Sequence, residues 1–159
     1  MVIEKLHEEL KDLNENEMKT VLKQVQALKR ARQSPLAYIE EMMNFQFVSF
    51  DSEKQTYIYR MYISDELKNR FQILHGGILA TFIDTAMGAT IFQVAGPKTQ
   101  AVTLDLQVHF LAPGTTGWLY AHTIVIKKGR TIITLESKVY DEQEKIIAVA
   151  TSTFFQKSG

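Results

Sequence analysis

Asp84 is the residue of this 159-residue chain that is best placed to do chemistry. It lies within residues 78–92, the most apolar stretch, where burying a carboxylate without a partner is costly. His75, Gly76 and Gly77 stand just before this stretch. Glycines at the start of a helix leave backbone N–H groups open to a negative charge. One interpretation is therefore a reactive carboxylate, and the other is a structural acid that caps the backbone or pairs with a lysine.

The length of helix between the glycines and Asp84 limits how Asp84 could act as a reactive carboxylate. Gly77 and Asp84 are seven residues apart, which is about 10.5 Å of helix rise and nearly two turns. The two positions share a face, but a base or nucleophile must come within about 3–3.5 Å of its target. If both residues serve one active site, they must come from different subunits. A catalytic role therefore predicts a two-fold homodimer with two shared sites.

The elements that carry these residues are a long helix and a series of strands. A helix is expected over 76–94, closed by Gly96 and Pro97, and its apolar surface predicts burial on most sides. The strand candidates are residues 44–50, 54–63, 100–110, 117–127, 130–140 and 145–155. The pattern predicts an α+β fold in which the helix packs against an antiparallel sheet of about five to six strands.

The first 35 residues have a different character. Apolar residues at three-to-four spacing predict two amphipathic helices, with Asn16 as the N-cap of the second helix. Each helix has a narrow apolar stripe that must rest on the main domain or on a partner subunit. We therefore expect a helical extension over 1–35 and a main domain over 36–159. A DNA-binding helix-turn-helix is the alternative, but its basic residues gather only at one end.

Composition excludes several classes of function. Eighteen acidic and eighteen basic residues give no net charge, which disfavours nucleic acid and anionic membranes as partners. The chain has no cysteine, so disulfides and thiolate catalysis are excluded. Residues 78–95 approach the length of a membrane span, but Asp84, three threonines and Gln93 argue against one. We expect a soluble cytoplasmic protein.

Several short motifs, in this order and spacing, resemble those of a known family. They are His75-Gly76-Gly77, Asp84-Thr85-Ala86, and residues 101–106, 110–114 and 128–131. The set resembles the hotdog-fold acyl-CoA thioesterases, in particular the PaaI-like branch related to 4-hydroxybenzoyl-CoA thioesterases. The resemblance covers about residues 45–155. It implies a long helix wrapped by an antiparallel sheet, and a homodimer or a dimer of dimers (a homotetramer).

The resemblance also implies a role for each matching residue. Gly76 would donate its N–H to the thioester carbonyl, and Gly77 would let the backbone come close there. Asn69 matches an asparagine that binds this carbonyl or the attacking water. Asp84 of the partner chain would be the general base or the nucleophile, and Thr103 would hold the water. CoA is then part of the acyl-CoA substrate, and no metal or other cofactor is expected.

Other residues near these motifs have two interpretations each. His75 serves either the geometry of the loop or the chemistry directly. The resemblance places Lys128, Gly129 and Arg130 near the pantetheine or phosphates of CoA, although a charged hairpin tip without a ligand is equally common. Asp105 lies two residues after the water-binding threonine and is expected on the same face of the strand, where it either approaches the site or forms a polar face near a subunit contact.

Two other functions remain open. A hotdog domain can bind and sense acyl-CoA without cleaving it, and the helical extension is compatible with such a role. A hydratase or dehydratase is a lesser alternative, because no histidine follows His75 on the expected helix. The acyl group, and the choice between base and nucleophile for Asp84, are left open by the sequence.

Overall fold

The computed structural model describes residues 1–157, so the last two residues of the predicted 36–159 domain lie outside it. The chain forms two compact units, Met1–Met42 and Met43–Gly159, and each is described by itself. The predicted boundary after residue 35 depends on composition and stays a prediction.

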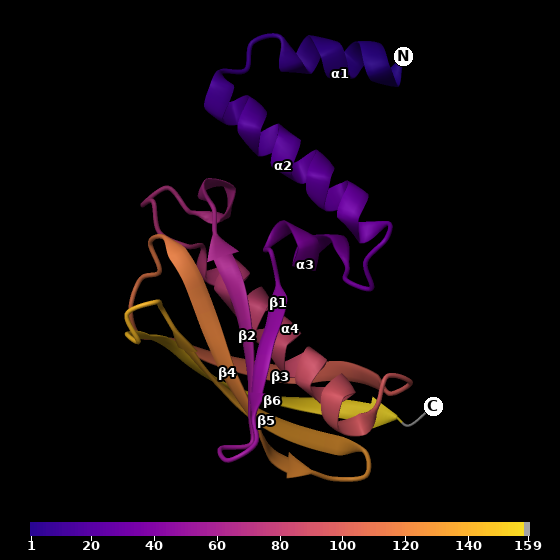
Figure 1. Cartoon of the computed structure of the whole chain (residues 1–159), viewed down its shortest axis with the longest axis vertical. Helices are drawn as coiled ribbons and strands as arrows, with labels where there is room; N and C mark the ends of the chain where they lie inside the picture. Colours follow the sequence, from indigo (N-terminus) through magenta and orange to yellow (C-terminus); the bar gives the residue numbers. More distant parts are fainter. Residues whose placement is uncertain (158–159) are drawn as a thin grey trace. The chain divides into compact units, whose positions relative to one another are not determined.

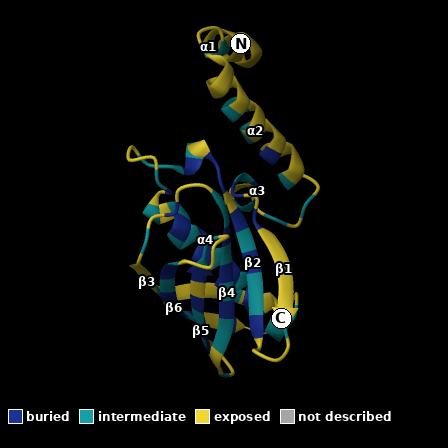
Figure 2. Ribbon diagram, turned by 60° about the vertical axis from the view of Figure 1, so that its left-hand side comes forward, coloured by how far each residue is buried: buried dark blue, intermediate teal, exposed yellow. Residues whose placement is uncertain are grey.

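The first unit consists of three helices, α1 (Val2–Leu10), α2 (Glu15–Ala31) and α3 (Tyr38–Met42) (Figure 1). The sequence predicted α1 and α2 but not the short α3. The Asn14 side chain accepts from the Glu17 N–H, and the Glu17 carboxylate accepts from the Asn14 N–H. The N-cap is therefore Asn14 and not Asn16, because only this spacing closes a capping box. Much of the α2 surface is exposed (Figure 2).

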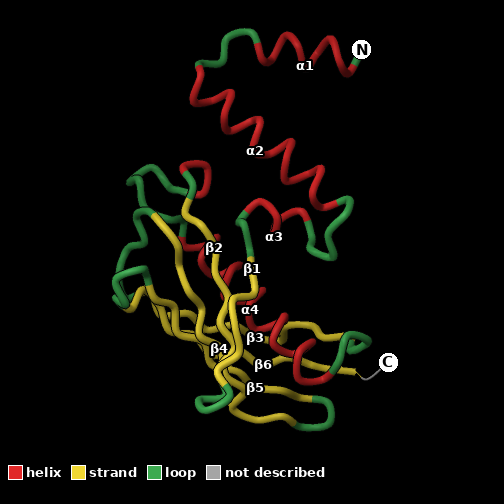
Figure 3. The backbone as a smooth tube through the Cα atoms, viewed as in Figure 1, coloured by secondary structure: helices red, strands yellow, loops and turns green. Residues whose placement is uncertain are grey.

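The second unit contains one long helix, α4 (Gly76–Ala95), and one six-stranded sheet (Figure 3). A single turn of 3-10 helix, η1 (Asp65–Leu67), precedes α4. The strands are β1 (Gln46–Asp51), β2 (Thr56–Ile63), β3 (Gln100–Phe110), β4 (Gly117–Lys128), β5 (Ile132–Tyr140) and β6 (Ile146–Lys157). They are antiparallel in the order β1-β2-β4-β5-β6-β3, and α4 packs on this sheet. This is the predicted α+β hotdog arrangement.

The buried residues show how α4 and the sheet meet. Along β5 every second residue is buried, as expected for a strand with one face on a core. On α4 the buried residues recur at three-to-four spacing and are Leu79, Phe82, Ile83, Ala86, Met87, Thr90 and Ile91. The expectation that α4 is buried on most sides is therefore wrong for a single chain, because one sheet covers one face of a helix. Although α4 is long and apolar enough to cross a membrane, core helices share these properties.

Strand β3 lies at one edge of the sheet and, among residues 1–157, pairs only with β6. Its register shifts between Thr103, which is opposite the buried Phe154, and Asp105, which is opposite Thr153. Leu104 is the extra residue of this bulge, and one extra residue reverses the alternation of faces. Thr103 therefore faces α4 while Asp105 faces away. The expectation that the two share a face is wrong.

Candidate active site

The loop before α4 is held by His75. The His75 N–H donates to the Leu67 carbonyl oxygen at 3.0 Å, and the His75 Nδ1 accepts from the Gly77 N–H at 3.0 Å. The imidazole thus caps the helix and fixes the loop. A Cβ on Gly77 would lie 3.2 Å from His75 Nδ1, so glycine lets the ring fold back over the first turn. Within residues 1–157, the Gly76 N–H has no hydrogen-bond acceptor.

A cavity of about 440 Å³ opens beside this helix start. It is lined by Asn69, Ile73, Leu74, Gly76, Leu79 and residues 110–114. The Asn69 side-chain oxygen accepts from the Phe71 N–H at 2.8 Å, which orients the amide. Phe110 lies against Gly76, since a Cβ there would be 3.5 Å from the ring. The structure thus brings Asn69 and Gly76 together. Phe110 was not predicted as a site residue, although motif 110–114 contains it.

Asp84 and Thr103 form a second group. The Thr103 hydroxyl donates to Asp84 Oδ1 at 2.8 Å, from the inward face of β3. Asp84 is half-buried, which corrects the expectation of a buried carboxylate. It lies beside the inward face of β3, at the margin of the α4 surface that packs on the sheet. In the described part of the chain, its hydrogen-bond partner is this hydroxyl and not a lysine or a backbone group, so one carboxylate oxygen stays open.

The basic turn between β4 and β5 has a structural role of its own. Lys128 Nζ donates to the Val94 carbonyl oxygen at 2.7 Å and so binds the negative end of α4. A Cβ on Gly129 would lie 2.8 Å from the Ile132 carbonyl oxygen, so this turn requires glycine. The Arg130 side chain is exposed. Their role in binding substrate stays a prediction.

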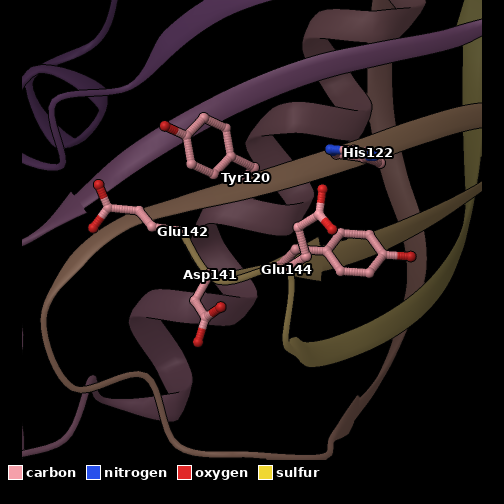
Figure 4. Close-up of a pocket in the computed structure, with 6 residues that line it drawn as sticks. Tyr120, His122, Asp141, Glu142 and Glu144 are labelled. Carbon is pink, nitrogen blue, oxygen red and sulfur yellow. The ribbon is translucent and has the colours of Figure 1, made fainter.

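A cavity of about 650 Å³ lies elsewhere and contains none of the predicted site residues. Its walls are Tyr120, His122, Tyr140, Asp141, Glu142 and Glu144 (Figure 4). The His122 and Tyr140 rings are 5.0 Å apart, and burial lowers the pKa of His122. In residues 1–157, no group of three or more His, Asp or Glu side chains is arranged to hold a metal ion.

Comparison with known proteins identifies the family. The thioesterase superfamily model matches residues 71–148, which include Gly76, Asp84 and Thr103. The Bacillus subtilis protein ComA2 is 32% identical over 84 residues, which cover 52% of this chain and 67% of ComA2. The chain belongs to the thioesterase superfamily. It is accordingly a thioester hydrolase.

Three further comparisons agree with this superfamily. Escherichia coli YigI, a medium/long-chain acyl-CoA thioesterase, is 25% identical over 95 residues, covering 52% of this chain and 61% of YigI. A Bacillus halodurans protein with CoA in its crystal structure is 29% identical, with a TM-score of 0.82 over 98% of this chain and 99% of that chain. The Escherichia coli PaaI protein shares the fold, with a TM-score of 0.67 at 21% identity, over 86% and 95% of the chains. The predicted thioesterase family is confirmed.

Proposed function

We propose that this chain hydrolyses acyl-CoA thioesters to a carboxylic acid and free CoA, at a site shared by two copies of the chain. The observation that carries the proposal is the separation of two complementary half-sites on one chain. Asn69 and Gly76 offer donors in one cavity, while Asp84 and Thr103 form a hydrogen-bonded pair further along α4. The rise of about 10.5 Å between Gly77 and Asp84 is too long for one chain to place both halves on one carbonyl.

The free edge of β3 supports the pairing of two copies. Val102 and Leu104 are 58% and 57% exposed on an eleven-residue edge strand, and a long apolar edge is a template for another strand. Thr103 marks the carboxylate half-site on β3, and Phe110 marks the helix-start half-site. An antiparallel β3–β3 pair centred midway between these residues would place Thr103 opposite the partner's Phe110. The helix-start half-site of each chain would then lie beside the carboxylate half-site of the other chain, which makes two complete sites per dimer.

The chemistry follows from the donors and acceptors in each half-site. The Gly76 N–H and the Asn69 amide would bind the carbonyl oxygen as it becomes negative, which commonly contributes about 3–4 kcal/mol per donor. The partner's Asp84 would activate water or attack the carbonyl carbon, with one oxygen held by Thr103. The C–S bond then breaks, and CoA leaves as a thiolate that takes up the proton released by water. After direct attack by Asp84, water would hydrolyse the acyl–aspartyl anhydride to release the carboxylic acid. A thiolate is a good leaving group, so the proposed reaction uses neither a strong general acid nor a metal.

The basic turn extends this proposal to the CoA moiety. Lys128 binds α4 at Val94, ten residues or about 15 Å beyond Asp84. Arg130 is exposed on the same turn and would contact phosphate groups. CoA bound in the Bacillus halodurans relative supports a CoA-type substrate.

The activity is tested by thiol release from acetyl-, octanoyl-, palmitoyl- and phenylacetyl-CoA. Because the chain has no cysteine, a thiol reagent detects only released CoA. We expect turnover on at least one ester, and Asp84→Asn should abolish it while the protein stays folded. Full turnover by Asp84→Asn would refute the mechanism. Tight acyl-CoA binding without thiol release would favour the sensing alternative.

The shared site is tested by mixing two inactive variants. Gly76 is the first helical residue, a position that accepts proline, so Gly76→Pro removes the N–H and retains the helix. Gly76→Ala retains the N–H, and its Cβ would only touch Phe110, so it is the matched control. We expect Gly76→Pro to lower kcat about 100- to 1000-fold. Random pairing of Gly76→Pro with Asp84→Asn chains should restore about a quarter of the activity, because half the dimers regain one of two sites. No restoration in isolated mixed dimers would refute a shared site.

A further inference from the structure

Helices α1 and α2 each present an apolar stripe that the rest of the first unit, Met1–Met42, does not cover. None of the residues of α1 is buried, and Leu6 at its centre is 52% exposed. On α2, Leu22 is 55% and Val25 42% exposed. A nine-residue helix such as α1 is marginal in water unless its apolar face is packed. A partner is therefore needed to cover the α1 stripe, which consists of Ile3, Leu6 and Leu10.

The stripe on α2 is distinct from the face that holds α3. Ala27 is buried, and Gln24 accepts from the Tyr38 hydroxyl of α3 at 2.8 Å, so these residues mark the α3 side. The α2 stripe consists of Met18, Leu22 and Val25. Ala27 is nine residues after Met18, which is about two and a half turns and therefore the opposite side of the helix. Packing on α3 thus leaves the α2 stripe free for a second helix.

The net charges of the two helices are complementary. The α1 helix has three glutamates and one lysine, whereas α2 has two glutamates, three lysines and one arginine. An acidic helix therefore suits a basic one, while two copies of α1, or two of α2, would repel each other. Both stripes have the three-to-four spacing of a helix–helix seam. The α1 stripe is uncovered within its own unit, and the α2 stripe of another copy offers an apolar surface on a helix of opposite charge.

We propose that α1 of one copy packs its stripe on the α2 stripe of a second copy. The contact is reciprocal, so a two-fold axis closes it and covers both stripes of both chains. It lies entirely within the helical first unit. It is independent of the proposed thioesterase site, and its test has no catalytic readout.

Single-cysteine chains test this contact directly, because the natural chain has no cysteine. Full-length Leu6→Cys and Val25→Cys chains, with tags of different mass, are mixed under oxidising conditions. A mixed disulfide can form only between two chains, since neither chain has both cysteines. Glu8→Cys is the matched control on α1, because two residues rotate it by about 200° from Leu6. We expect the mixed disulfide of Leu6→Cys with Val25→Cys to form at least about ten times faster than that of Glu8→Cys with Val25→Cys.

Equal rates for the two mixtures would overturn the proposal, because they would show random collision. Faster formation of the Leu6→Cys or Val25→Cys homodisulfide would also overturn it, since like helices would then meet. No mixed disulfide, with the mixture still dimeric by light scattering, would show that the stripes are covered by another surface. Thiol release from acyl-CoA is measured separately, and its failure would leave this result unaffected.

Discussion

The hydrogen bond between Thr103 and Asp84 gives the sharpest test of the proposed chemistry. Thr103→Val replaces the hydroxyl with a methyl group of similar size and removes the 2.8 Å bond to Asp84 Oδ1. A hydrogen bond to a charged group contributes about 1.5–3 kcal/mol, and we use the lower end because the pair is open to solvent. About 1.5 kcal/mol corresponds to a roughly tenfold fall in kcat. We expect KM to change little, because the hydroxyl binds the carboxylate rather than the CoA moiety.

The assay is steady-state thiol release by the full-length protein with the best acyl-CoA ester. Thr103→Ser retains a hydroxyl at this position and should retain most of kcat. Thr151→Val is the matched control, because Thr151 is exposed on the neighbouring β6 and pairs with Gln107 on the far side of the bulge from Thr103. It should leave kcat unchanged. An unchanged kcat in Thr103→Val, or an equal loss in Thr103→Ser, would refute the reasoning.

Three further predictions concern stability. Gly129→Ala should lower the free energy of unfolding by about 1–3 kcal/mol, because its Cβ would meet the Ile132 carbonyl oxygen; an unchanged urea midpoint would contradict this. Burial lowers the pKa of His122, so the unfolded chain binds a proton more readily than the folded chain. The free energy of unfolding should therefore fall as the pH drops below 6.5. His122→Gln should remove this pH dependence, which is measured by urea titrations at several pH values. The hydrogen bond from Arg30 lowers the pKa of Glu41, so this pair stabilises fully above pH 4.5 and less as the pH falls through the lowered pKa. Arg30→Gln should therefore reduce the helical circular dichroism at neutral pH and weaken its acid transition, and identical pH curves would refute the role of the pair.

Much of the site's framework could be predicted because local signals define it. Glycines begin and end α4, and the structure places that helix at Gly76–Ala95 against the predicted 76–94. The distance between Gly77 and Asp84 along this helix is too long for both to act in one active site of one chain. This spacing alone predicted a second subunit. Alternation, strand-forming composition and the turn residues between the segments predicted the six strands. Each of these features depends on residues that are close in sequence, where periodicity is informative.

The errors arose where distant residues decide the outcome. Nothing in the sequence around Leu104 marks a β-bulge, so Asp105 was predicted on the wrong face of β3. The role of Lys128 depends on the end of a helix more than thirty residues earlier, at Val94. Phe110, the last residue of β3, borders the helix-start cavity only because the fold places the end of β3 beside the start of α4. Sequence patterns do not report such contacts, since the fold alone makes them.

The incomplete burial of α4 connects these results. Its residues are apolar nearly all round, yet the sheet covers only one face, and Asp84 lies half-buried at the margin of that face, beside Thr103 of β3. Strand β3 likewise exposes Val102 and Leu104 along an unpaired edge. A sequence that served a single chain would carry polar residues at both places. The uncovered apolar surface and the separation of Gly76 from Asp84 therefore both support the proposal that a second copy covers the helix and completes the site.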